Sequence, residues 1–176
     1  MDEEVQKVLD DRIASLRASA EHLWDMKQLD IAFAHSETEH RNEIIRGHLW
    51  IGDQLTDGSA FDAIVSVGCV NTAYPTHPGI TYHRIIASDS RDEDMLRHFD
   101  AACDFIHAHR DKRVLVHCQA GVSRSPTICV AYLMKHCGLF LEGAYMTVKG
   151  ARKIICPNIG FMKQLIVYEE QLNRKD

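Results

Sequence analysis

The sequence has no apolar run long enough to cross a bilayer and no charged-then-apolar signal segment at its start. Asp2 excludes myristoylation of an N-terminal glycine. A net charge of −5 provides no overall basic field, which argues against nucleic acid and anionic membrane as partners. None of the six cysteines forms a CxxC pair, so they are expected to be reduced thiols. Together these features predict a cytoplasmic and/or nuclear protein.

The 176 residues fit one domain with an N-terminal extension. Residues 2–30 carry apolar side chains three and four positions apart, which predicts an amphipathic helix. Residues 35–43 are polar and are interpreted as a linker. We therefore predict an extension over 1–43, a catalytic domain over 44–173 and a tail over 174–176. The extra helix is expected to pack on the core or to mediate a partner or dimer contact.

Strands and helices alternate in the predicted domain, and this alternation indicates an α/β fold. Short β-branched runs predict strands at 63–67, 114–116 and 81–87, with a weaker one at 49–51. Helical periodicity covers 92–109, 125–137, 141–153 and 159–173. The expected architecture is a mostly parallel central sheet of four to five strands, flanked by helices.

The most informative segment runs from a buried strand into a cysteine, a loop of small residues and a helix. Cys118 and Arg124 are six positions apart, so five residues can wrap around one tetrahedral anion with their N–H groups inward. Arg124 offers a planar fork for two phosphate oxygens. The predicted phosphate-binding residues are Gln119, Ala120, Gly121, Val122, Ser123 and Arg124.

Cys118 is the candidate nucleophile, because converging amides and a helix N-terminus favour a thiolate. The alternative is a buried structural cysteine. Ser125 is placed to donate its hydroxyl to this thiolate as it leaves, or else is a plain helix-start serine. Adjacent strand residues point to opposite faces, so His117 is expected to support the loop through a backbone hydrogen bond rather than to relay protons.

The run His117–Pro126 resembles the signature of dual-specificity protein phosphatases, in the cysteine-dependent protein-tyrosine-phosphatase superfamily. Three further segments resemble other parts of this family: 89–95 with Phe99, 131–135, and 155–161 with Gln164 and Leu165. The resemblance covers about 44–173 and implies a protein-tyrosine-phosphatase-like fold. It also implies hydrolysis of phosphotyrosine and phosphoserine or phosphothreonine in a phosphorylated protein substrate, through a phosphocysteine.

The resemblance places the general acid at Asp89, which also lies nearest the end of a predicted strand, where sites on parallel sheets collect. Residues 92–94 are expected in the first turn of the following helix instead, complementing its dipole. The resemblance further suggests that Asn158 steadies the site; a plain turn residue is the alternative. This mechanism needs no cofactor and no metal. Cys103 and His107, four apart on one predicted helix, are a poor metal site.

Two alternatives and one hypothesis stay open. A phosphoprotein-binding pseudophosphatase would retain residues 118–124, the predicted anion loop, but would not hydrolyse its ligand. A phosphatase of a non-protein substrate would use the same catalytic residues on another phosphate ester. The absence of basic residues between Cys118 and Arg124 weakens a polyanionic substrate. Cys69 follows a predicted strand and is a possible redox partner of Cys118; an unreactive loop thiol is the alternative.

Overall fold

The computed structural model describes residues 7–8, 10–15, 40–68 and 76–174. Its centre is a five-stranded sheet of order β1-β2-β5-β3-β4, in which β1 is antiparallel to β2 and all other pairs are parallel. The strands are β1 (Arg41–Ile45), β2 (Leu49–Gly52), β3 (Ala63–Gly68), β4 (Thr81–Ile86) and β5 (Val114–His117). The predicted α/β class and mostly parallel sheet are confirmed.

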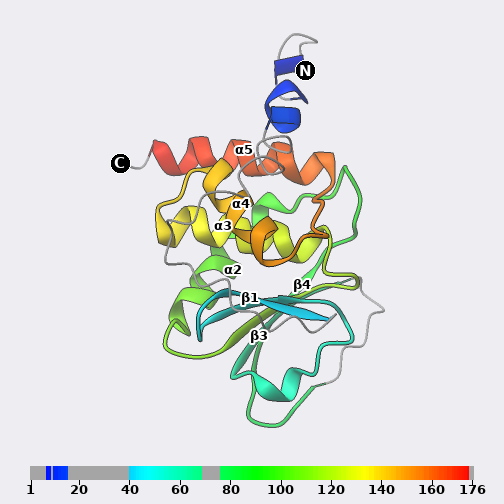
Figure 1. The fold of residues 1–176 in the computed structure, drawn as a ribbon, viewed down its shortest axis with the longest axis vertical. Coiled ribbons are helices and arrows are strands. Elements are labelled where there is room, and N and C mark those ends of the chain that lie inside the picture. The colour runs from blue at the N-terminus through cyan, green and yellow to red at the C-terminus, as the bar shows by residue number, and fades with distance from the viewer. Residues whose placement is uncertain (1–6, 9, 16–39, 69–75, 175–176) are drawn as a thin grey trace.

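The helices pack on one face of this sheet (Figure 1). They are α2 (Leu96–Ala108), α3 (Arg124–Cys137), α4 (Leu141–Ala151) and α5 (Ile159–Asn173). Alternate strand residues such as Val65 and Val116 join the main core beneath them, whereas Ile64 and Leu115 form a smaller cluster with Phe61 on the other face. This second cluster lies beside the short 3-10 helix η2 (Gly58–Ala60). In the described part of the chain, no helix combines the length and apolarity needed to cross a membrane.

The edge strand β1 begins at Arg41, inside the stretch 35–43 that the sequence predicts to be a linker. Arg41 and Asn42 are tolerated there because β1 is an edge strand and both side chains are partly exposed, whereas the buried Glu43 accepts a hydrogen bond from Gly47 N. The Arg41 guanidinium lies over Trp50 and Phe61, 5.6 and 5.4 Å from the ring centroids. The sheet therefore starts before residue 44, and the predicted domain boundaries remain predictions.

Helix α2 begins at Leu96, so residues 92–94 precede it, and their predicted place in its first turn is wrong. Asp94 Oδ1 still accepts from Arg97 N at 3.3 Å, but Glu93 turns back toward Ser88. The N-cap position, Met95, provides no side-chain cap. The start of this helix therefore takes its stabilisation from elsewhere in the fold.

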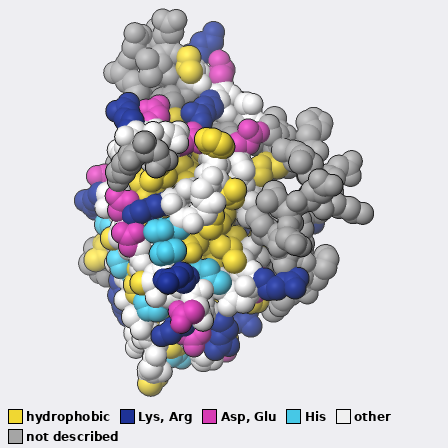
Figure 2. All heavy atoms as spheres, turned by 90° about the vertical axis from the view of Figure 1, so that its left-hand side faces the viewer, with side chains coloured by type: hydrophobic (Ala, Val, Ile, Leu, Met, Phe, Trp, Pro, Cys, Tyr) yellow, Lys and Arg dark blue, Asp and Glu magenta, His cyan; other side chains and the backbone are white. Residues whose placement is uncertain are grey.

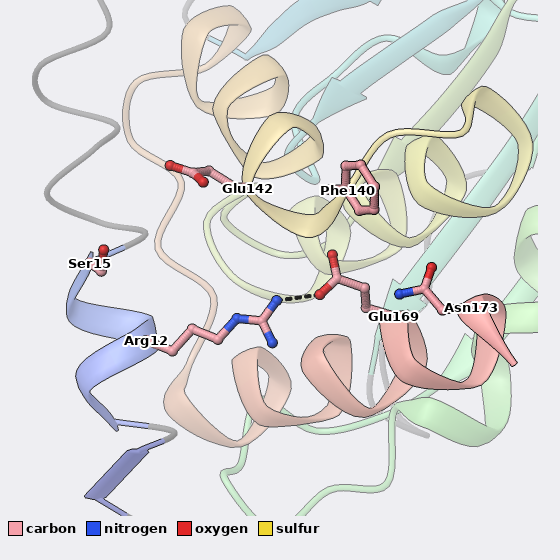
Figure 3. A pocket seen from close by; sticks show the side chains of 6 residues that line it. All are labelled: Arg12, Ser15, Phe140, Glu142, Glu169 and Asn173. Atoms are coloured by element: carbon pink, nitrogen blue, oxygen red, sulfur yellow. Dashed lines mark hydrogen bonds and ion pairs between the residues drawn. The ribbon is translucent and has the colours of Figure 1, made fainter.

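The described N-terminal residues are helical and pack on α5. Ile13 is buried in the main core, Asp10 lies 3.8 Å from Lys163, and Arg12 pairs with Glu169. Between these elements and α4 lies a pocket of about 270 Å³ that Arg12 and Glu169 help to line (Figure 3). The described N-terminal residues therefore pack on the core through Ile13. The predicted partner or dimer contact of the extension stays a prediction.

Candidate active site

The candidate site lies at the carboxyl edge of the parallel strands. Strand β5 runs between β2 and β3, and Cys118 follows its last residue directly. The loop from Cys118 leads into α3 at Arg124, and the segment after β4 carries Asp89. Loops after neighbouring parallel strands meet at one edge, which is where ligands bind in such sheets. The topology thus brings the predicted nucleophile, anion loop and acid to one end of the molecule.

Every carbonyl between Cys118 and Arg124 accepts a hydrogen bond from the surrounding scaffold. The bonds, in loop order, are Gln54 N to Gln119 O at 3.2 Å, Arg152 Nη2 to Ala120 O at 3.4 Å, Arg152 Nε to Gly121 O at 3.0 Å, Cys156 N to Val122 O at 2.7 Å, and Thr127 N to Ser123 O at 3.3 Å. In a planar trans peptide the following N–H points opposite to the carbonyl, and no described peptide is cis. The N–H groups of residues 120–124 are therefore turned into the loop, where they can bind an anion.

Position 121 requires glycine for two reasons, its backbone φ angle and the lack of room for a Cβ atom. Its φ is 65°, in the left-handed region that favours glycine. A Cβ at this position would lie 2.8 Å from the Gly52 carbonyl oxygen and 2.9 Å from Arg152 Nη2. A larger residue would therefore push the loop away from the two groups that shape it.

Cys118 is buried, and its Sγ lies 3.3 Å from Ser125 Oγ. Ser125 Oγ donates to the Gly52 carbonyl at 3.5 Å, and either Ser125 or Cys118 can be the donor in the contact between them. The hydroxyl is within reach of the sulfur, and the donor role of Ser125 toward it stays a prediction. Burial raises the pKa of the thiols of Cys103 and Cys129, which therefore remain protonated at neutral pH.

Arg124 is buried at the first position of α3. Its Nη1 donates to the Ala87 carbonyl at 3.2 Å. Ala87 directly follows β4 and precedes the segment that carries Asp89. The guanidinium is thus fixed between the loop of residues 118–124 and the segment that carries Asp89, and its role as a phosphate clamp stays a prediction.

Arg152 is a functional candidate that the sequence analysis did not single out. It lies just beyond α4, is buried, and binds two loop carbonyls together with Asn42 Oδ1 at 2.8 Å. Burial lowers the pKa of its guanidinium, whereas Asp53, whose Oδ2 lies 3.8 Å from Nη2, raises it. In the sequence Arg152 is one basic residue beside Lys153, and only the long-range contacts distinguish the two.

His117 is buried behind the loop. Burial lowers the pKa of its imidazole to about 4, although a hydrogen bond to the Cys118 backbone and the nearby Asp53 carboxylate oppose this effect. The ring is therefore neutral at physiological pH. Its bond to the Cys118 backbone agrees with the supporting role predicted for it.

A neutral buried His117 makes stability depend on pH. Its ordinary pKa of 6.5 applies to the unfolded chain, which therefore binds a proton before the folded chain does. We expect the His117 contribution, about 3 kcal/mol in total, to be lost as the pH falls from 6.5 toward 4. Urea unfolding across this range should show a steeper loss for the wild type than for His117→Gln. Equal slopes for both proteins would contradict the prediction.

Asp89 is bound by two side chains. Its Oδ1 accepts from Ser123 Oγ at 2.7 Å and from Asn158 Nδ2 at 2.8 Å. Ser123 Oγ in turn accepts from Asn158 N at 3.0 Å. The structure therefore places Asn158 against the predicted acid, and Asn158 also caps α5 through Phe161 N at 3.0 Å. Asn158 thus contacts the predicted acid and caps a helix, and its role in steadying the site stays a prediction.

Cys69, the possible redox partner, lies outside the described residues, and its role stays a hypothesis. Within the described ranges, no three histidine, cysteine or acidic side chains are grouped so that they could hold a metal ion. His107 instead stacks on His136 with ring centroids 4.1 Å apart.

The family model described as "Dual specificity phosphatase, catalytic domain" matches residues 49–171. Rat "Dual specificity protein phosphatase 5" is 47% identical over 102 residues, which is 57% of this chain and 26% of that protein. "Dual specificity protein phosphatase 18" of Pongo abelii is 45% identical over 114 residues, covering 64% of this chain and 59% of that one. The chain thus spans less than two thirds of either relative.

Among solved structures, human DUSP28 is similar over 78% of this chain and 97% of its own, with a TM-score of 0.72 and 32% identity. A mouse putative dual specificity phosphatase complexed with zinc tungstate has a TM-score of 0.71 and 31% identity, and covers 81% of this chain and 94% of its own.

Proposed function

Since this chain belongs to the dual-specificity phosphatase catalytic-domain family, we propose that it hydrolyses phosphotyrosine and phosphoserine or phosphothreonine in protein substrates through a phosphocysteine. The observation that carries the proposal is the loop between Cys118 and Arg124. All five of its intervening carbonyls are held outward, so its amides face the position of an anion. Such a loop, with a thiol at its start and a guanidinium at its end, is suited to a phosphoryl group.

In the first step the Cys118 thiolate attacks phosphorus, and the bond to the leaving oxygen breaks. Asp89 donates its proton to that oxygen, so the product leaves as a neutral hydroxyl. The inward amides and Arg124 stabilise the three equatorial oxygens as charge redistributes. Their main contribution is that they are in place before the substrate binds.

In the second step water attacks the phosphocysteine. Asp89, now a carboxylate, takes a proton from the water as the sulfur–phosphorus bond breaks. Ser125, 3.3 Å from the sulfur, donates a hydrogen bond to the departing thiolate. The products are inorganic phosphate and the starting form of the protein. Asp89 regains from water the proton that it donated in the first step.

On the face in Figure 2, positive and negative side chains are interspersed. The absence of nucleic-acid and membrane partners stays a prediction, based on the net charge of −5. We also propose a cytoplasmic and/or nuclear location, supported by free thiols at all five described cysteines, Cys103, Cys118, Cys129, Cys137 and Cys156.

The test is phosphate release by the wild-type chain from a small aryl phosphate and from phosphotyrosine and phosphothreonine peptides, with reductant and metal chelator present. Turnover of all three substrates is the expected result. Binding of the peptides without turnover would favour the pseudophosphatase alternative. Turnover of the aryl phosphate alone would point to a non-protein substrate.

A further inference from the structure

The segment carrying Asp89 is held from one side by the first half of α5. Asn158 donates to Asp89 Oδ1 and, at 3.3 Å, to the Ser90 carbonyl. Gly160 lies so close to Arg91 that a Cβ there would overlap its carbonyl oxygen. Helix α5 therefore lies directly against the acid loop, which we define as residues 88–95.

Gln164, one turn further along α5, binds the far end of the acid loop with both ends of its amide. Its Oε1 accepts from Leu96 N at 2.7 Å, and its Nε2 donates to the Glu93 carbonyl at 2.8 Å. Leu96 opens α2, and the N-cap Met95 offers no side-chain cap, so this contact satisfies a helix N–H that its own neighbours leave unmet. A residue 68 positions away thus determines where the acid loop ends and α2 begins.

Glu93, whose carbonyl Gln164 binds, also contacts Ser88 at the start of the acid loop through its side chain. Its Oε2 accepts from Ser88 N at 2.9 Å and from Ser88 Oγ at 2.7 Å. These two hydrogen bonds lower the pKa of the Glu93 carboxyl and keep it ionised at neutral pH. Ser88 is the residue before Asp89, so the loop is closed at its base by Glu93 and fixed to α5 by Gln164.

We infer that Gln164 is a positioning residue for the proposed general acid Asp89. The inference rests on the proposed function, because it concerns proton donation to the leaving oxygen. A general acid must lie within hydrogen-bond reach of that oxygen, and a misplacement of about 1 Å can reduce the rate about 100-fold. Removing the Gln164 amide releases one end of the loop without touching Cys118 or Arg124. It therefore weakens proton donation and leaves nucleophilic attack intact.

The experiment compares two substrates that differ in their need for an acid. Phenyl phosphate has a poor leaving group that must be protonated, whereas dinitrophenyl phosphate expels a stable anion. For Gln164→Leu we expect kcat/KM to fall about 10-fold with phenyl phosphate and less than about twofold with dinitrophenyl phosphate. Asp89→Ala should show the same split, with a larger loss. Gln171→Leu, an exposed glutamine two turns further along the same helix, should match the wild type on both substrates.

A second variant guards against a failure of Gln164→Leu to fold. Gln164→Glu is of nearly equal size and keeps the acceptor for Leu96 N, but its carboxylate repels the Glu93 carbonyl. It should show the same substrate split at neutral pH, and the split should shrink in acid as the new carboxyl becomes protonated. Equal losses on both substrates, or no loss in either variant, would overturn the inference. Failure of the wild type to turn over either substrate would instead overturn the proposed function.

Discussion

The Cys118→Ser protein should bind phosphorylated peptide but release no measurable phosphate. A serine hydroxyl is not ionised at neutral pH, so the nucleophile is lost, and we expect kcat to fall by about 10⁴-fold or more. The anion site should survive, because the loop carbonyls are held by Gln54, Arg152 and other groups that do not involve the sulfur. Phosphate release and calorimetric binding of a phosphotyrosine peptide measure the two properties separately.

The matched control for this substitution is Cys137→Ser. Cys137 is an exposed thiol at the last residue of α3, the helix that begins at the anion loop. Its replacement should leave both turnover and binding at the wild-type level. A Cys118→Ser protein that turned over substrate at a rate near that of the wild type would place the nucleophile elsewhere.

Replacing Arg124 by lysine should reduce kcat/KM by about 10²- to 10³-fold although the charge is kept. The guanidinium presents two parallel donors to phosphate oxygens, which an ammonium group cannot reproduce. The substitution also changes the contact that Arg124 Nη1 makes with the Ala87 carbonyl at 3.2 Å, between the anion loop and the acid loop. Steady-state kinetics with an aryl phosphate should show a lower kcat and a higher KM.

Arg174→Lys provides the corresponding control, because Arg174 lies at the end of α5 with a largely exposed side chain. Its kinetics should equal those of the wild type. If Arg124→Lys also kept the wild-type kcat/KM, transition-state charge would be stabilised without a bidentate clamp, and the proposed role of Arg124 would be wrong.

The anion loop could be predicted because its determinants are local. Cys118, Gly121 and Arg124 are separated by a few residues, and the strand before them and the helix after them are marked by periodicity alone. Helix α5 was predicted with its observed bounds for the same reason. Local pattern is sufficient where one short segment both forms the element and carries the chemistry.

The surroundings of the loop could not be predicted in this way. Arg152 binds Gly121 and Ala120 across 31 and 32 positions, and Gln164 reaches Leu96 across 68. No neighbouring residue in the sequence marks Arg152 as buried or Gln164 as a partner of the backbone at Glu93 and Leu96. Long-range contacts also explain why the start of α2 was predicted too early. Acidic residues at the start of a helical pattern usually indicate the first turn of the helix. In this fold, however, Gln164 binds the Glu93 carbonyl, and the Glu93 carboxylate accepts from Ser88.

The way Arg152 holds the anion loop has a consequence for the end of the reaction. With its carbonyls already bound by Arg152, the loop needs little rearrangement to accept a tetrahedral oxyanion. The same amides can bind the phosphoryl group of a substrate and free inorganic phosphate, so we expect the loop to bind both. Phosphate released in the last step should therefore compete with the next substrate for the same amides. If the proposed function holds, a site prepared in this way should both accelerate phosphoryl transfer and be inhibited by the inorganic phosphate that the reaction releases.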